Sequence, residues 1–243
     1  MISEHDTFKI DTIAACCGCA SACALILFIF SLIPTSLADN INPQLYSVDS
    51  KPFGLTMSDW SVKWFQWLLP IPQENNPASD KTGQDCSVGQ PTKDVWFLVQ
   101  TTSGPGERTC TIPAGRAILL PVAANECSTA EDPALTTESA LRACAVAGNE
   151  VNSIVAIVDG VKLKNLEQYR VQSPLFTFTY PDNNIFGAPV GPTQAVADAY
   201  MTFLKPLSPG NHTLQFSQVT LDNPTTGTKS FAYSIVYHLI VKP

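Results

Sequence analysis

The chain has 243 residues, which suits one large or two small domains, and its formal net charge is −7. It is 45% apolar and only 14% charged, a composition typical of a globular protein with a large core. No run of lysine and arginine occurs, so the composition argues against a nucleic-acid binder. Nineteen prolines and thirteen glycines indicate many turns, as in all-β domains.

Residues 1–38 are predicted to be a signal peptide rather than part of the fold. No charged residue occurs from Ile13 to Ile33, and Ser36-Leu37-Ala38 is a small-x-small cleavage signal. We expect cleavage after Ala38, which leaves residues 39–243 as a single exported β-rich domain, secreted or at the cell surface. The alternative is an uncleaved N-terminal anchor, because the uncharged stretch is 21 residues long and the residues before it are acidic. Only this segment is expected to contact a membrane.

Residues 55–72 form the most distinctive stretch of the exported part. Three tryptophans lie there at helical spacing i, i+4, i+7: Trp60, Trp64 and Trp67. Thr56 and Asp59 form a capping box, so we expect the helix to start near Met57 and to end before Pro70. The tryptophan face could be a carbohydrate-binding platform. However, the helix is apolar over most of its circumference, which favours a core position.

The exported part contains four cysteines, at Cys86, Cys110, Cys127 and Cys144. An even number of cysteines in an exported domain is typical of disulfides. We favour Cys86–Cys110 and Cys127–Cys144, because these pairs close the shortest loops, although four cysteines allow three connectivities. A zinc site is the alternative, but no C-x-x-C spacing is present and no metal is expected.

The remaining sequence consists of short predicted strands separated by turns. The predicted strands are 94–101, 108–112, 116–122, 151–158, 161–163, 175–180, 212–220 and 229–241. Asp159-Gly160 is a strong hairpin signal, residues 125–133 are predicted to be an acidic loop, and Thr137–Ala147 a second helix capped by Gly148. Residues 193–204 remain open between a short helix and a strand.

These elements predict a mainly β fold. We expect a disulfide-stabilised β-sandwich, Ig-like or jelly-roll, with an N-terminal Trp-rich helix and one further short helix.

A set of short motifs extends from Trp60 to the end of the chain. The motifs are Trp64-Phe65-Gln66-Trp67, Asn76-Pro77, Asp80, Thr82-Gly83, Cys86, Gly89-Gln90, Val95-Trp96-Phe97-Leu98, Arg108-Thr109-Cys110, Ile112-Pro113-Ala114-Gly115, Pro121, Asn125, Glu126-Cys127, Asn184, Phe186-Gly187, Ala197-Asp198, Pro206-Leu207, Pro209-Gly210 and His212-Thr213. As a set they resemble an uncharacterised family of exported proteins that carries no known activity. The chain departs from that pattern at Phe65, where a second adjacent tryptophan is expected. The resemblance implies export, one compact domain and disulfides.

Carboxylates are the strongest candidates for chemistry. Five lie in predicted loops near the cysteines: Asp80, Asp85, Glu126, Glu131 and Asp132. Glu126 stands out because it follows an apolar strand directly, and Arg108 could pair with it. A glycosidase needs two carboxyls about 5–5.5 Å or about 6.5–9.5 Å apart, and Glu126 with Asp80 or Asp85 is the candidate pair. Calcium is a weaker alternative, since no EF-hand spacing occurs. Solvated loop charge is the default interpretation.

Other catalytic signals are weak. The chain has no G-x-S-x-G motif and no glycine-rich phosphate loop, and His212 and His238 fall in predicted strands. Asn211 begins an N-glycosylation sequon. The leading hypothesis is therefore a non-enzymatic exported domain, without cofactor, that binds a glycan or a protein or has a structural role. The alternative is a secreted hydrolase acting on polysaccharide.

Overall fold

The computed structural model describes residue 42 and residues 44–101, 104–224 and 229–243. The predicted signal peptide and its cleavage position after Ala38 lie outside these residues. Within the described ranges, no helix combines the length and the apolar character needed to cross a membrane.

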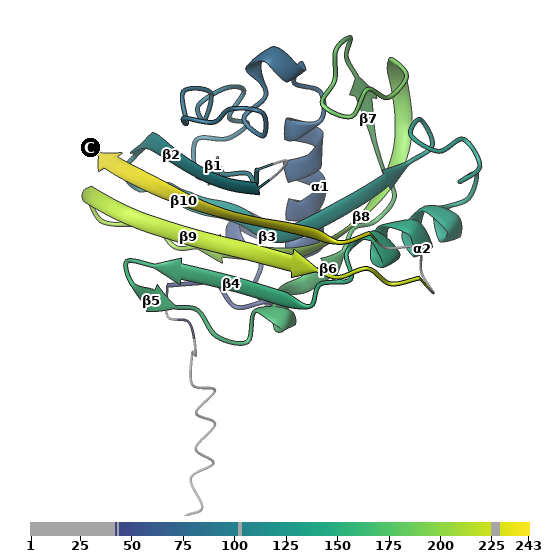
Figure 1. The fold of residues 1–243 in the computed structure, drawn as a ribbon. Coiled ribbons are helices and arrows are strands. Elements are labelled where there is room, and N and C mark those ends of the chain that lie inside the picture. Colours follow the sequence, from purple (N-terminus) through teal and green to yellow (C-terminus); the bar gives the residue numbers. More distant parts are fainter. Residues whose placement is uncertain (1–41, 43, 102–103, 225–228) are drawn as a thin grey trace, which may run out of the picture. The chain divides into compact units, whose positions relative to one another are not determined.

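Two five-stranded sheets form the framework, and they confirm the predicted disulfide-stabilised β-sandwich (Figure 1). The first sheet contains β1 (Val95–Phe97), β3 (Ala117–Ser128), β8 (Gly191–Leu204), β6 (Arg170–Gln172) and β7 (Phe176–Tyr180). The second sheet has the order β2 (Gly104–Pro113), β10 (Phe231–Lys242), β9 (Gly210–Thr220), β4 (Ser153–Val158) and β5 (Val161–Lys162). Both sheets are mixed, because β1 pairs with β3 and β2 pairs with β10 in parallel.

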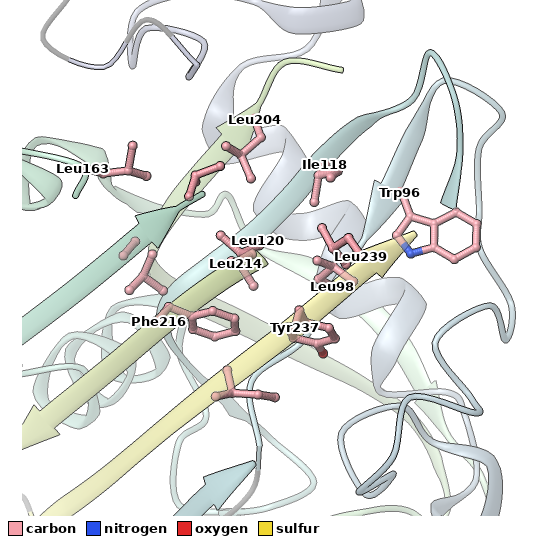
Figure 2. Close-up of a cluster of buried hydrophobic side chains, with 14 of the residues drawn as sticks. Trp96, Leu98, Ile118, Leu120, Leu163, Leu204, Leu214, Phe216, Tyr237 and Leu239 are labelled. Carbon is pink, nitrogen blue, oxygen red and sulfur yellow. The ribbon is translucent and has the colours of Figure 1, made fainter. Parts of the chain in front are cut away.

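An apolar cluster fills the space between the two sheets, and Figure 2 shows part of it. Phe216 of β9 stacks on Tyr237 of β10, with ring centroids 6.1 Å apart. Leu120 of β3 belongs to the same cluster. In β10 the alternate residues from Tyr233 to Val241 are buried, whereas the residues between them are exposed or half-buried. This is the two-faced pattern that the sequence predicts for the last strand.

Helix α1 (Met57–Leu68) covers the opposite face of the first sheet. The predicted capping box is present: the Asp59 N–H donates to Thr56 Oγ1, and the Thr56 N–H donates to the Asp59 carboxylate, both at 3.1 Å. The alternate residues Ala195, Ala197 and Ala199 of β8 belong to the cluster on this face, where their small side chains let the helix approach closely. A sheet buried on both faces has little polar alternation, which explains why residues 193–204 were ambiguous in sequence.

The three tryptophans of α1 are each at most 6% exposed, so this face belongs to the core and displays no aromatic platform. Each indole also satisfies a backbone carbonyl outside the helix. The indole N–H groups donate from Trp60 to Pro52, from Trp64 to Leu98 and from Trp67 to Val88, at 2.8–3.0 Å. The helix therefore holds three separate segments of the chain against the first sheet.

A second helix, α2 (Glu138–Gly148), packs on β3 and β8. Thr137 caps it by accepting a hydrogen bond from the Ala140 N–H. Gly148 is the last helical residue rather than the cap, and Asn149 takes the C-cap position. A side chain at Gly148 would clash with that of Asn125, so close packing requires the glycine. The described residues also contain three short 3₁₀ helices: Pro52–Gly54, Gln73–Asn75 and Leu166–Tyr169.

Both disulfides have the predicted pairing. Cys86–Cys110 joins the loop after α1 to β2, and Cys127–Cys144 joins β3 to α2, with Cα–Cα distances of 6.1 and 6.0 Å. The hairpin β4–β5 also forms at Asp159-Gly160, where both residues have positive φ. Positive φ at both central residues is what a tight hairpin turn requires.

Two strands of the first sheet differ from the sequence prediction. β1 has only three residues, and β3 continues to Ser128, into the first four residues of the predicted acidic loop 125–133. The longer β3 is held by antiparallel pairing with β8 as far as Ser128 opposite Ala195. β1 pairs with β3 only at residues 117–119, so no strand within the described residues covers the rest of that β3 edge.

A β-bulge between Pro121 and Ala123 changes which side chains of β3 face α1. Before the bulge, Leu119 belongs to the cluster on the α1 face. After it, Ala124 packs against that cluster, and Glu126 reaches Tyr180, another member of it. The bulge therefore places Glu126 on the α1 side of the first sheet.

Replacing Trp64 with alanine tests the role of α1 as core. We expect Trp64→Ala to lower the free energy of unfolding by about 3–5 kcal/mol, because it removes a large buried side chain. Urea unfolding followed by circular dichroism measures the change. The matched control is Phe53→Ala, at an aromatic side chain that is half exposed. A loss for Trp64→Ala no larger than that for the control would show that α1 is not a core element.

Candidate functional site

A cavity of about 410 Å³ lies beside the part of β3 that β1 leaves uncovered. Its walls come from α1, from residues 99–101 directly after β1, from residues 124–126 of β3, and from the neighbouring ends of β9 and β10. A volume of this order lies within the range of pockets that hold small ligands. The cavity is therefore the candidate functional site.

The walls are mostly apolar and aromatic. Trp64 and Phe65 contribute from α1, Phe186 from the loop before β8, and Phe231 and Tyr233 from β10. The Tyr233 hydroxyl donates to the carbonyl of Val122, so its polar atom is satisfied by β3. Walls of this kind bind the apolar part of a ligand, and the polar side chains of the lining orient the ligand.

Glu126 is the most unusual of those polar groups. Its side chain lines the cavity and is only 7% exposed. The hydroxyl of Tyr180 donates to Glu126 Oε1 at 3.0 Å, whereas Oε2 has no protein hydrogen-bond donor. Within the described residues, no lysine, arginine or histidine lies within ion-pair distance of this carboxyl. The site therefore holds a buried acid without a protein countercharge.

Burial raises the pKa of Glu126 well above its usual range. The negative charge of Glu131 raises this pKa further, while the hydrogen bond from Tyr180 opposes the rise. Burial also raises the pKa of Tyr180, and the two glutamates raise it again. The phenol therefore keeps its proton and acts as a donor to Glu126.

Glu131 is the partner of Glu126 at this site. It is exposed and lines the cavity, so it stands where the cavity meets solvent. The Ser128 hydroxyl donates to Glu131 Oε2 at 2.7 Å and holds the side chain in place. The negative charge of Glu131 acts on the Glu126 carboxyl, so the two acidic side chains influence each other at this site.

Neither aspartate proposed as a partner of Glu126 lines this cavity in the described part of the chain. The Asp80 carboxylate accepts hydrogen bonds from the backbone N–H groups of Thr82 at 2.8 Å and Asp85 at 2.9 Å. Partial burial raises the pKa of Asp80, but these hydrogen bonds outweigh it and hold the pKa below its ordinary value. Asp80 therefore organises its own loop, and Glu126 lies with Glu131 instead.

Arg108 does not form an ion pair with Glu126 either. Its buried guanidinium donates to the backbone carbonyls of Asp80 at 2.7 Å and Ala78 at 3.2 Å, and to the Tyr237 hydroxyl at 2.7 Å. The arginine joins the loop after α1 to the second sheet. The expectation that Arg108 is structural fits these contacts, but through different partners.

A second buried carboxylate, Asp198 on β8, shows a different arrangement. It is 0% exposed, and its Oδ1 accepts hydrogen bonds from Arg170 at 2.8 Å and from Asn149 at 2.7 Å. Arg170 supplies a positive charge to this acid. Asp198 is thus part of a structural network between β8, β6 and the end of α2.

His212 and His238, the two histidines among the described residues, do not form a nucleophilic site. His212 Nδ1 bonds to the Asp159 carboxylate at 2.7 Å, and its Nε2 bonds to the backbone carbonyl of Ser208 at 2.8 Å, so both ring nitrogens are occupied. His238 pairs with Glu107 on the surface. The sequon residue Asn211 is exposed at the start of β9. Within the described residues, no group of three or more His, Cys, Asp or Glu side chains is placed to hold a metal.

Sequence reasoning identified Glu126 but not its surroundings. Glu131 was one of five candidate carboxylates, and its spacing i+5 from Glu126 gives no helical or strand signal. Tyr180 lies 54 residues further along the chain, in the predicted strand 175–180, to which no site role was assigned. The signal that did point to the site was an acidic residue directly after an apolar run.

Replacing Glu126 with glutamine tests its raised pKa. The folded protein holds the Glu126 proton more tightly than the unfolded chain does. This contribution to stability is full below the unfolded pKa and is lost as the pH rises through the folded pKa, by up to about 1.4 kcal/mol per pH unit. Glu126→Gln keeps an acceptor for Tyr180 but does not titrate. We expect the variant to lose this decline in unfolding free energy above the unfolded pKa.

Urea unfolding at a series of pH values measures the difference, with Glu167→Gln, at an exposed glutamate, as the control. Parallel stability profiles of the wild type and Glu126→Gln would contradict a raised pKa.

No family model and no curated protein matches the chain. Solved structures with similarity include PbICP-C in complex with falcipain-2, which is 12% identical, covers 61% of this chain and 99% of its own, and has a TM-score of 0.23. The cysteine protease inhibitor EhICP2 from Entamoeba histolytica is 16% identical, covers 59% and 96%, and has a TM-score of 0.19. Amebosin is 11% identical, covers 62% and 100%, and has a TM-score of 0.17. At TM-scores this low, the similarities carry no argument about function.

Proposed function

We propose that the protein is a non-enzymatic binding domain of the cell exterior that takes a small, largely apolar ligand into the cavity beside β3. The observation that carries this proposal is the cavity itself, about 410 Å³ in volume, with a lining that is apolar over more than half of its residues and includes five aromatic side chains and a tyrosine-bound carboxyl. Its buried carboxyl has an oxygen without a protein donor, which leaves one polar position for a ligand.

The cysteines support placement outside the cell. Disulfides form and persist in oxidising compartments, and this domain has two of them. The predicted signal peptide points the same way, whether it is cleaved after Ala38 or retained as an anchor. A glycan or protein partner would enter the cavity through one protruding group, because α1 and both sheets contribute to the walls.

The geometry supports binding over glycoside hydrolysis. Glycosidases hold their two carboxyls about 5–5.5 Å or about 6.5–9.5 Å apart, which leaves room for the sugar and for water. Asp80 is held in its own loop by two backbone N–H groups. Neither Asp80 nor Asp85 lines the cavity beside Glu126, so this cavity does not bring together the carboxylate pair that the hydrolase hypothesis names.

Filling the cavity tests the proposed function. The Ala124 side chain lines it, so Ala124→Leu is expected to occupy part of the space that a ligand needs. The probe is the neutral dye N-phenyl-1-naphthylamine, whose fluorescence rises in apolar surroundings. We expect saturable binding to the wild type and a loss of about tenfold or more in affinity for Ala124→Leu, equivalent to at least about 1.4 kcal/mol.

Val190→Leu is the matched control, because Val190 is 61% exposed and does not line the cavity. Thermal unfolding of both variants checks that they remain folded. Dye binding that does not saturate, or that Ala124→Leu leaves unchanged, would refute a ligand site in this cavity.

A further inference from the structure

The cavity has a polar end with unused hydrogen-bonding capacity. Glu126 is more than nine-tenths buried, lines the cavity and has an oxygen, Oε2, that no protein donor reaches. An unsatisfied buried acceptor is costly, and a carboxylate is the most costly kind. A ligand donor at this position would remove that cost.

The charge of the site is also uncompensated. Two acidic side chains, Glu126 and Glu131, line the cavity, and no ion pair of the described residues neutralises either of them. Asp198 shows how the same fold treats an acid that only supports structure, since Arg170 lies 2.8 Å from its carboxylate. No cation of the described residues takes that place at Glu126. The missing countercharge identifies the kind of group that fits.

The other titratable groups that face the carboxyl pair do not supply this charge. Tyr180 from β7 and Tyr233 from β10 are neutral, because burial raises the pKa of both phenols. Lys229, before β10, lines the cavity but is exposed and outside ion-pair distance of both glutamates. The position beside Glu126 therefore remains open to a cation from a ligand.

We propose that the ligand of this cavity carries an organic ammonium group on an apolar body, and that the ammonium binds between the carboxyls of Glu126 and Glu131. This rests on the proposed function. The ammonium donates to Glu126 Oε2 and to the Glu131 carboxylate, while the Tyr180 hydroxyl keeps its bond to Glu126 Oε1. The aromatic walls formed by Trp64, Phe65 and Phe231 hold the apolar body, and aromatic faces also attract a cation.

Binding of an ammonium has a consequence for protons. The cation is attracted to an ionised carboxylate, so Glu126 must release the proton that its raised pKa retains in the empty cavity. Below the raised pKa of Glu126, each ammonium that binds displaces up to one proton to solvent. Affinity then rises with pH, by up to about tenfold per pH unit, and levels off above that pKa. A neutral ligand of the same shape displaces none.

The test compares three probes of similar shape and different charge: 2-phenylethylammonium, 2-phenylethanol and phenylacetate. Isothermal titration calorimetry of the purified protein gives their affinities, and repeating each titration in buffers of different ionisation enthalpy counts the protons released. We expect the ammonium to bind at least about tenfold more tightly than the alcohol. We also expect the acetate to bind most weakly and only the ammonium to release protons.

Two variants connect this preference to the site. Glu126→Gln is expected to remove the ammonium preference and the proton release. Glu167→Gln, which removes an exposed glutamate outside the cavity, is expected to change neither. An ammonium preference that survives in Glu126→Gln would refute the placement of the cation.

The remaining outcomes separate the two proposals. If the dye and the alcohol bind in the cavity but the ammonium binds no more tightly than the alcohol, the proposed function stands and the ammonium class is refuted. If none of the three probes binds and the dye binding is insensitive to Ala124→Leu, both proposals are refuted. A parallel titration with calcium chloride completes the set: calcium binding that depends on Glu126, without ammonium binding, would identify a metal site and overturn the inference.

Discussion

The packing of α1 against the first sheet is the constraint on which the rest of this domain depends. The indole N–H of Trp64 donates to the Leu98 carbonyl at 2.8 Å, directly after β1 ends. The same tryptophan is packed among β1, β3 and β8 on the sheet face that carries the buried alanines. Trp64 is thus buried among apolar side chains, and its indole N–H also satisfies the Leu98 carbonyl at the point where the chain leaves the sheet.

The cavity lies where the first sheet is incomplete, because β1 is much shorter than β3. β1 covers β3 at only three positions, and the residues after it line the cavity instead of extending the pairing. The bulge between Pro121 and Ala123 then turns Glu126 towards Tyr180 on the α1 side. A strand without the bulge would place Asn125 there, because side chains alternate along a strand. A one-residue irregularity therefore decides which side chain meets the cavity.

Several residues of the motifs that carry the resemblance form hydrogen bonds with backbone groups and do not contribute to a reactive site. Asn76, which is fully buried, donates to the carbonyls of Leu68 and Ile71 and so closes the turn after α1. Gln90 donates to the Phe97 carbonyl and accepts from the Phe97 N–H, so its side chain satisfies both backbone groups of this β1 residue. The motifs thus describe how long polar loops are held on the sandwich. This explains why the resemblance implies a fold and compartment but no reaction.

Local signals in the sequence determined the elements whose residues are neighbours along the chain. The capping box of α1, the Asp159-Gly160 hairpin, the alternation of β10 and the disulfide pairs that close short loops all belong to this group. The sandwich class followed from them, because short strands and frequent turns leave few other ways to bury apolar faces.

Tertiary structure alone decided the parallel pairing of β2 with β10, the full length of β3 and β8, and the partner of Glu126. β8 is buried on both faces, so it has no alternation from which a strand could be recognised. Glu126 meets Tyr180 only because β7 and β3 both lie beside β8. Contacts between distant segments depend on sheet order and register, which local propensity does not encode, and the candidate site is built from such contacts.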